Sequence, residues 1–334
     1  MKIATVSHSH IALRQQLFFR EVARQGHDVL MIAPGEWRNL RAQNYDKLLS
    51  PGAGNFRFRT CRHIGGEDIY LYRLLGARDL VNGFQPDWVY VQAEPGSITA
   101  YEVSRWGISK AAIFTWENIH IFKDHPTPCD VLSKYDLVIC GNPEAVELVK
   151  PCNPNTFLML QVGVDTDHFR ARPNVERDMN VAYIGRAAPE KGLPYLLQAW
   201  PMAHILEHKD FKELPWWYSQ VKVVVAYSQD TTWWKEQAPN YVLLEAMATE
   251  CLGVASDTAA MKYWLEGAPG IVIVEGHEQP DGDLRLDRVL RLKEGIQKAL
   301  DMPDGIRKEN REYVISKFSN KVIAQALIKV LSSS

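Results

Sequence analysis

The residues best suited to chemistry include two basic side chains on one turn. Arg186 and Lys191 lie in GRAAPEKG, between the apolar run NVAYIG and the helix-like stretch LPYLLQAW. A turn leading into a helix offers free backbone N–H groups and partial positive charge, and Arg and Lys add full charges that suit phosphate oxygens. The pattern predicts a phosphate site, although it lacks the full glycine pattern of a P-loop or dinucleotide-binding turn. An ordinary loop with surface charges is the alternative.

A second candidate is the stretch KEQAPNYVLLEAMATE, from Lys235 to Glu250. Glu236 and Gln237 precede a loop-like Ala-Pro-Asn, and we expect Glu245 at the start of the apolar helix that follows. An acid at a helix start is favourable with or without a ligand, because it interacts with the helix dipole. These acids alone therefore fit a surface as well as a site.

Polar residues also follow three apolar runs in the first third of the chain. The runs are KIATVS, DWVYVQ and AAIFTW, and each reads as a buried strand. Ligands of open α/β sheets bind outside the carboxyl ends of the strands, so we expect these residues to line one edge together. Each one taken singly is explained more simply as solvated or capping. The candidates are His8, His10, Glu94, Glu117, Asn118 and His120.

The elements that position these residues follow an alternating α/β pattern. Continuous apolar runs bounded by turns predict parallel strands covered by helices on both faces, in a doubly wound sheet. Gly26 in ARQGHDV fits a helix end that needs a left-handed residue. A length of 334 residues favours two domains. The irregular stretch QVGVDTDHFRARPNVERD places their boundary near 165–178, and the tail reads as one or two amphipathic helices.

Composition excludes several classes of partner. Lys+Arg 38 against Asp+Glu 40 gives a formal charge of −2, which offers no field for nucleic acid. The five cysteines show no CxxC spacing, so we expect neither a zinc site nor a disulfide framework, and a reducing cytoplasm fits. No apolar run approaches the ~20 residues of a spanning helix. Trp216–Trp217 and Trp233–Trp234 are interpreted as core aromatics, with a membrane interface or an acceptor pocket as the alternatives.

Five stretches in order, over nearly the whole chain, resemble the retaining glycosyltransferases of family 4. They are GHDVLMIAP, GVDTDHF, GRAAPEKG, KEQ…LLEAMA and FSNKVIAQAL. The resemblance implies a GT-B fold, in which two Rossmann-like domains face a central cleft. Residues 1–165 would bind the acceptor and residues 176–316 the nucleotide sugar, with a last helix, about 317–334, packed back on the first domain. Only 236 − 191 = 45 positions separate Lys191 from Glu236, so the C-terminal domain is expected to be shortened.

The resemblance also implies roles for individual residues. Arg186 and Lys191 match the basic pair that neutralises the donor diphosphate, where fixed cations stabilise the leaving group without a metal. Glu245 matches the acid that binds the ribose hydroxyls. The acid that contacts the donor sugar is Glu236, nine positions before Glu245, or Gln237, eight before. Many members carry a histidine where this chain has Glu117. The implied donor-binding residues are Gly185, Arg186, Lys191, Glu236, Gln237, Asn240, Tyr241, Val242 and Glu245, the catalytic residues are Glu236, Arg186, Lys191 and Glu117, and the acceptor-binding residues are His8, His10, Glu94 and Asn118.

The expected activity is transfer of a sugar, with retention, from a nucleoside diphosphate to a hydroxyl. The donor would be linked to UDP or GDP as a co-substrate, with no cofactor, and the acceptor would be a glycan, a lipid-linked saccharide or a small molecule. The expected location is the cytoplasm, with peripheral contact to the inner face of the membrane. Two alternatives stay open: a nucleotide-sugar epimerase on the same scaffold, and a degenerate relative that binds sugar without turnover. A dehydrogenase is less favoured because no GxGxxG follows any expected strand.

Overall fold

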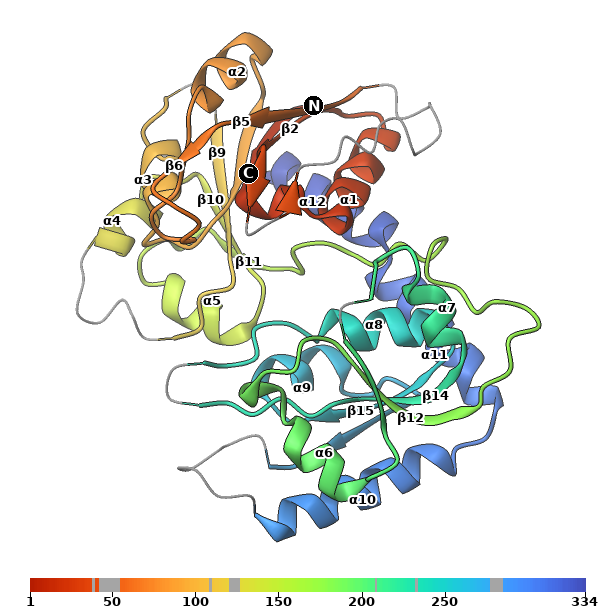
Figure 1. Cartoon of the computed structure of the whole chain (residues 1–334). Helices are drawn as coiled ribbons and strands as arrows, with labels where there is room; N and C mark the ends of the chain where they lie inside the picture. The colour runs from red at the N-terminus through yellow and green to blue at the C-terminus, as the bar shows by residue number, and fades with distance from the viewer. Residues whose placement is uncertain are drawn as a thin grey trace. The chain divides into compact units, whose positions relative to one another are not determined.

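The chain divides into two compact units. The computed structural model describes residues 1–37, 40–41, 55–107, 110–119, 127–207, 209–231, 234–276 and 285–334. Contacts assign Met1–Gly163 and Asn320–Ser334 to the first unit, and Val164–Ser319 to the second (Figure 1).

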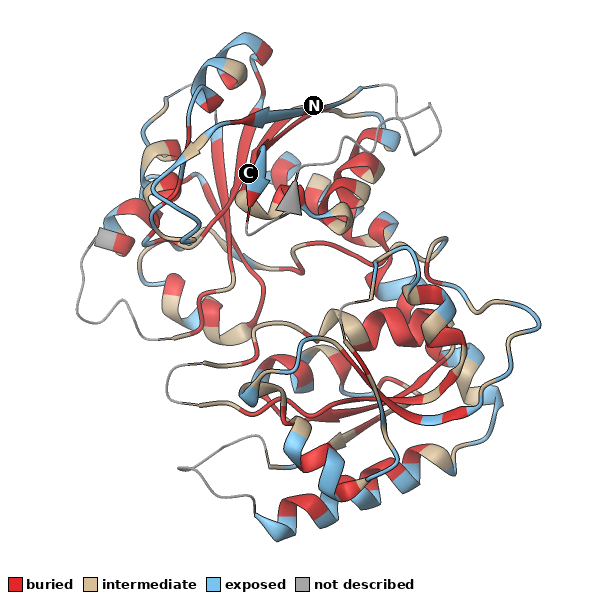
Figure 2. Cartoon of the chain, viewed as in Figure 1, coloured by how far each residue is buried: buried red, intermediate tan, exposed pale blue. Residues whose placement is uncertain are grey.

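The first unit is built on a seven-stranded parallel sheet with the strand order β11-β10-β9-β8-β1-β2-β5. The apolar runs of the first third form strands as predicted, because their side chains are buried on both faces of the sheet, and the strands are largely buried in Figure 2. In the register of the central strands, Val6 lies opposite Ile32 on one side and Val91 on the other. The strands are β1 (Lys2–Val6), β2 (Asp28–Pro34), β5 (Phe56–Cys61), β8 (Trp88–Gln92), β9 (Lys110–Thr115), β10 (Leu137–Cys140) and β11 (Thr156–Leu158).

Helices cover both faces of this sheet. One face packs against α1 (Leu13–Arg24), and α12 (Asn320–Ser333) packs against α1 in turn. Gln25 Nε2 donates to the carbonyl of Lys321 at 3.1 Å, and Gly26 ends α1 at φ +90°, as its place in the sequence predicted. The other elements are η1 (His8–Ile11), α2 (Ala77–Phe84), α3 (Ile98–Val103), α4 (Thr127–Leu132), α5 (Pro143–Val149) and two short ribbons, β3 (Glu36–Trp37) with β4 (Leu40–Arg41) and β6 (His63–Ile64) with β7 (Arg73–Leu74).

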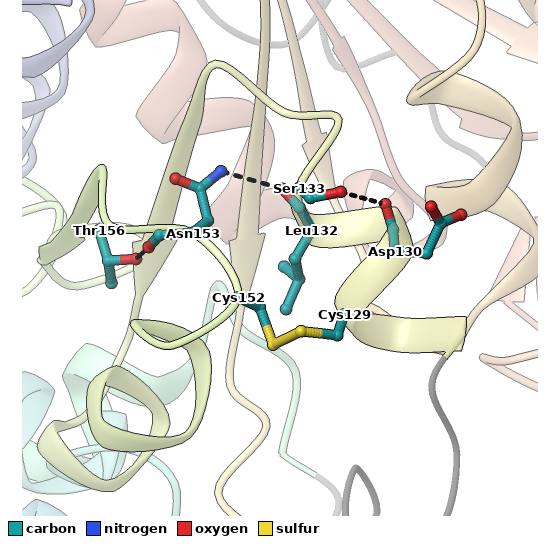
Figure 3. The surroundings of a disulfide bond; sticks show 7 residues. All are labelled: Cys129, Asp130, Leu132, Ser133, Cys152, Asn153 and Thr156. Atoms are coloured by element: carbon teal, nitrogen blue, oxygen red, sulfur yellow. Dashed lines mark hydrogen bonds between the residues drawn. A yellow bond between two sulfur atoms is a disulfide. The ribbon is translucent and has the colours of Figure 1, made fainter.

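A disulfide between Cys129 and Cys152 ties α4 to the turn after α5 (Figure 3). The expectation that the cysteines form no disulfide was therefore wrong for this pair, and it no longer supports a reducing compartment. The partners are 23 positions apart, and tertiary packing brings them together. Asn153 strengthens the same contact, because its Nδ2 donates to the carbonyls of Leu132 at 2.9 Å and Tyr135 at 2.8 Å.

The second unit has a five-stranded parallel sheet with the order β13-β12-β14-β15-β16. Its strands are again nearly continuous apolar runs, such as VKVVVA in β14, and the predicted strands NVAYIG, GVASD and GIVIVE form β12, β15 and β16. The strands are β12 (Met179–Ile184), β13 (His204–Leu206), β14 (Val221–Ala226), β15 (Leu252–Ser256) and β16 (Ile271–Val274). The helices are η4 (Pro189–Lys191), α6 (Leu193–Ala199), α7 (Leu214–Ser219), α8 (Tyr241–Ala248), α9 (Ala259–Leu265), α10 (Leu286–Leu300) and α11 (Gly305–Phe318).

The tryptophan pairs do not share one environment. Trp216 is 47 % exposed, so the interpretation of this pair as core aromatics was wrong for it. Its neighbour Trp217 carries Lys209 Nζ at 4.1 Å from its ring centroid, a cation–π contact. Trp233 lies outside the described residues. Within the described ranges, no helix combines the length and the apolar character needed to cross a bilayer.

Candidate functional site

The candidate site of the second unit lies where its strand order reverses. From β12 the chain moves to β13 on one side and then to β14 on the other, so loops diverge at the carboxyl ends of β12 and β14. Such a switch point is where open α/β sheets bind ligands. Gly185 follows β12 directly, and Tyr227, Ser228 and Gln229 follow β14.

Lys191 and Glu236 meet at this edge although 45 positions separate them. Lys191 Nζ lies 2.8 Å from Glu236 Oε2, and the Ser228 hydroxyl donates to the same oxygen at 2.6 Å. The ammonium also lies 4.5 Å from the ring centroid of Trp234. Glu236 is 7 % exposed, and its backbone N–H donates to Asp230 Oδ1 at 2.9 Å. The carboxylate of Glu236 therefore points to the basic turn, while Gln237 follows as a half-buried neighbour.

The basic turn is held against the loop after β14 by a glycine. Gly192 has φ +66°, and a Cβ built on it would lie 2.0 Å from the carbonyl oxygen of Tyr227. A side chain would therefore force the two backbones apart. A hydrogen bond from Gln229 N to the Glu190 carbonyl, at 2.8 Å, joins the same two loops. The position of Lys191 is thus fixed by the backbone on which it sits.

Arg186 lies on the same turn but has a different partner. Its side chain is 70 % exposed, and Nη2 lies 2.9 Å from Glu190 Oε1. Gly185 precedes it with φ +143°. The structure therefore pairs each predicted cation with its own carboxylate, Arg186 with Glu190 and Lys191 with Glu236. An anion that binds here must compete with these acids or displace them.

Glu245 is placed differently from the prediction. Helix α8 begins at Tyr241, so Glu245 lies in its second turn and not at its start. The side chain is 1 % exposed, and Tyr218 Oη donates to its Oε2 at 3.2 Å. Asn240 caps the helix from φ +55°, with Oδ1 accepting from Val242 N at 3.2 Å. Tyr241 and Val242 form the half-buried first turn.

The candidate site of the first unit lies at the corresponding switch point, between β1 and β8. Glu94 follows β8 and Glu117 follows the adjacent β9. Thr115 links them, since its hydroxyl donates to Glu94 Oε2 and accepts from the backbone N of Glu117 at 3.0 Å. Tyr70 Oη donates to Glu117 Oε2 at 3.2 Å. The predicted acids of this edge are therefore brought together.

Both carboxyls of this pair favour the protonated form more than ordinary acids do. Burial raises the pKa of Glu94 to about 7; the negative charge of Glu117 adds to the shift, and the hydrogen bond from Thr115 opposes it. Burial also raises the pKa of Glu117, against hydrogen bonds from Ile119 and Tyr70. A carboxyl that titrates near neutrality can accept or donate a proton during a reaction. The pair is therefore suited to acid–base chemistry or to holding hydroxyl groups.

The two predicted histidines differ in access. His8 is half-buried, and its ring lies 4.9 Å from that of Trp37 and 5.2 Å from that of Tyr72. His10 is fully buried: Nδ1 donates to the Ile32 carbonyl at 3.0 Å, and Nε2 lies 3.2 Å from Thr5 Oγ1. Burial lowers the pKa of His10 to about 3, which keeps it neutral. Its imidazole is sealed inside the unit, out of reach of a ligand in solution.

The remaining predicted residues of this edge are less accessible. Asn118 is 2 % exposed, and its Nδ2 donates to Glu144 Oε2 at 3.4 Å. His120 lies outside the described residues. Among the residues that the structure describes, no group of three or more His, Cys, Asp or Glu side chains could hold a metal ion.

Several residues that contact the predicted ones were not among them, including Tyr70, Thr115, Tyr218, Ser228, Glu190 and Asp230. Thr115 and Ser228 carry a weak signal, because each is a polar residue at the end of an apolar run, in AAIFTW and VKVVVAYS. Tyr70 and Tyr218 reach the acids Glu117 and Glu245 across 47 and 27 positions, which no local pattern encodes.

No protein-family model and no curated protein sequence matches the chain. Solved structures do match over its whole length. HepE of Anabaena in complex with UDP has 12 % identity and a TM-score of 0.69, with 100 % of this chain and 99 % of that chain covered. A glycosyltransferase of Rickettsia africae has 13 % identity and a TM-score of 0.70, with 99 % and 98 % covered. Sucrose-phosphate synthase of Thermosynechococcus elongatus has 16 % identity and a TM-score of 0.69, with 100 % of both chains covered. The chain therefore has two Rossmann-like units of the GT-B fold, as the resemblance implied.

Proposed function

We propose that the protein is a retaining glycosyltransferase of family 4 that transfers a sugar from a nucleoside diphosphate to a hydroxyl group. The observation that carries the proposal is the pairing of Lys191 with Glu236 at the switch point of the second sheet. A cation and an acid on adjacent loops are what a phosphosugar needs, one for the diphosphate and one for the sugar hydroxyls. HepE, which shares the fold, binds UDP, UDP with glucose, and UDP-glucose, which favours a UDP-linked donor over a GDP-linked one.

The roles in the second unit follow from charge and position. Cleavage of the anomeric C–O bond leaves negative charge on the diphosphate, and Lys191, fixed by its turn, would stabilise that charge. Arg186 has an exposed side chain, so it would leave Glu190 and add a second cation when the donor binds. Glu236 would accept hydrogen bonds from the sugar. Glu245, with Tyr218, would hold the ribose hydroxyls beside the first turn of α8, where Asn240, Tyr241 and Val242 lie.

The first unit would hold the acceptor, a glycan, a lipid-linked saccharide or a small molecule. Glu94 and Glu117 would bind its hydroxyls at the edge of the sheet, with Asn118 and His8 beside them. The raised pKa of Glu94 suits a group that shares a proton with the attacking hydroxyl.

The proposal is tested by donor turnover and product analysis with the full chain. UDP-, GDP- and ADP-linked sugars are screened for hydrolysis and transfer, and NMR of the product determines whether the anomeric configuration is retained. We expect Arg186→Ala to lower kcat/KM for the donor about tenfold, as loss of one charge-assisted contact does. Glu245→Gln should raise the donor KM by a similar factor. Arg170→Ala, at an exposed arginine of the same unit, is the matched control.

Two results would refute this function. Full turnover in Arg186→Ala and Glu245→Gln would show that these residues do not bind the donor. Failure of every nucleotide sugar to bind or turn over in a folded protein would remove the activity itself.

A further inference from the structure

A cavity of about 430 Å³ lies in the first unit, and its lining includes neither Glu94 nor Glu117. It is formed by β7, the start of α2, and α3 with the turn that follows it; these elements lie on one flank of the unit (Figure 1). Its lining residues are Arg73, Leu74, Leu75, Gly76, Arg78, Asp79, Tyr101, Glu102, Arg105 and Trp106.

The cavity has more positive than negative side chains. Three arginines face two acids, so the lining carries 3 − 2 = 1 positive charge. Arg73 pairs with Glu102, and Arg105 Nη2 lies 2.8 Å from Asp130 Oδ2, outside the lining. Arg78 Nη2 donates to the Trp106 carbonyl at 3.1 Å, and Arg78 has no carboxylate partner among the described residues. Arg78 therefore brings a charge to the cavity that no described acid neutralises.

Aromatic rings lie beside these charges. Tyr101 is 44 % exposed, and the guanidinium carbon of Arg105 lies 3.8 Å from its ring centroid. Trp106 is half-buried and packs on the apolar core of the unit with part of its surface in the cavity. Aromatic faces suit the C–H faces of a sugar ring, carboxylates such as Asp79 accept bonds from hydroxyls, and a guanidinium binds an anion through paired N–H groups. All three kinds of group line one cavity.

The cavity is distinct from the edge that carries Glu94 and Glu117. Ser97 starts α3 next to Glu94, because its N–H donates to the Glu94 carbonyl at 2.9 Å. Arg105 lies eight positions later, just beyond the other end of that helix. Eight positions of helix span about 12 Å, so Arg105 lies well along the chain from Ser97, and neither Glu94 nor Glu117 lines the cavity.

We propose that this cavity binds a saccharide that carries one anionic group, a carboxylate or a phosphate. The anion contacts Arg78 with help from Arg105, the ring packs on Tyr101 or Trp106, and Asp79 accepts from hydroxyls. The choice of a saccharide rests on the proposed function, since the site would anchor an acidic glycan away from the reacting hydroxyl.

Direct binding to the full chain, without donor, tests the proposal. The probes are a disaccharide ending in a hexuronic acid, a hexose phosphate, the neutral disaccharide of the same linkage, and inorganic phosphate, each titrated by calorimetry. We expect at least one acidic saccharide to bind about tenfold or more tightly than the neutral one and than inorganic phosphate. The arm that binds identifies the anion as carboxylate or phosphate. Arg78→Gln should lower that affinity by a similar factor.

Arg24→Gln is the matched control, because Arg24 is an exposed arginine on α1, a helix that does not line the cavity. Its binding should equal that of the unmodified chain. The proposal is overturned if neutral and acidic saccharides bind alike, if none binds, or if Arg78→Gln binds normally. Vesicles containing phosphatidylglycerol are a further probe. The proposal is also overturned if only they bind and Arg78→Gln lowers their affinity, since the cavity would then recognise a lipid surface. If the unmodified chain binds the acidic saccharide but transfers no sugar from any donor, the proposed function is refuted and the proposed saccharide site is not.

Discussion

Both sheets are parallel and doubly wound, but their switch points differ in charge. The edge of the second sheet pairs a cation with each acid, Lys191 with Glu236 and Arg186 with Glu190. The edge of the first sheet places two acids together, Glu94 and Glu117, with Thr115 and Tyr70 as hydrogen-bond donors. A doubly wound sheet thus fixes where a ligand binds, whereas the loop residues decide which ligand it is.

This difference suits the two halves of a group transfer. Fixed cations favour the charge that develops on a leaving diphosphate. A carboxyl with a raised pKa can hold or release a proton near neutrality, which a neutral hydroxyl substrate requires. The comparison is open to test at each edge separately, because each pair lies within one unit.

The largest effect is expected from removal of the cation at the second edge. Lys191→Ala should lower kcat for donor turnover about 100-fold or more, because it removes a fixed charge from the leaving diphosphate. It also leaves Glu236 buried with Ser228 but without its cation. Steady-state kinetics with the best donor measures the change, with circular dichroism to verify folding. Lys298→Ala, at an exposed lysine of α10, should be unchanged. A normal kcat in Lys191→Ala would show that the basic turn has no part in catalysis.

A smaller effect is expected from the glycine that positions this turn. Gly192→Ala should lower the free energy of unfolding by about 2–4 kcal/mol, since the new Cβ meets the Tyr227 carbonyl and the φ of +66° strains any side chain. Gly267→Ala has a similar φ of +80° with no atom within 4 Å, so it should cost only about 1 kcal/mol. Denaturant unfolding of both variants separates the close approach from the backbone strain. Equal losses would show that the turn is not held against the loop after β14.

The sequence predicted the sheets better than the sites. The β14 strand was recognisable because an apolar run such as VKVVVA needs no distant partner to be read as buried. The meeting of Lys191 and Glu236 depended instead on two loops 45 positions apart, and only the resemblance to a family suggested it. Glu245 was expected at a helix start, yet the helix begins four residues earlier at Tyr241, because Asn240 caps it.

Two other residues show why burial is harder to predict than strand position. His10 looked like a polar loop residue, but the short helix η1 turns its ring inward, where Ile32 and Thr5 satisfy both nitrogens. Cys129 and Cys152 have no spacing motif, and only the packing of α4 against the turn after α5 joins them. In each case the deciding contact is tertiary, so no local pattern records it.

At the acidic edge, the expected effect is a dependence of stability on pH. The pKa of Glu94 is about 7 in the folded chain against an ordinary value of 4.5, so the folded state binds the proton more tightly. Stability from this group is therefore complete below pH 4.5 and is lost as the pH rises to about 7, with a decline of about 2–4 kcal/mol at most. Glu94→Gln cannot ionise and should remove that decline, leaving the one from Glu117, whose pKa burial also raises.

Unfolding curves of both proteins, measured below pH 4.5, between 4.5 and 7, and above 7, test this expectation. As the pH rises, the free energy of unfolding of the variant should increase relative to that of the unmodified chain. Thr115 can still donate to the amide oxygen of Gln, while no charge has to be buried. Glu147→Gln, at an exposed acid on α5, should keep the original pH dependence. If Glu94→Gln and the unmodified chain lose stability in parallel, Glu94 is an ordinary ionised acid. The two edges would then differ only in their cations, and the proposal that Glu94 holds a proton near neutral pH would be refuted.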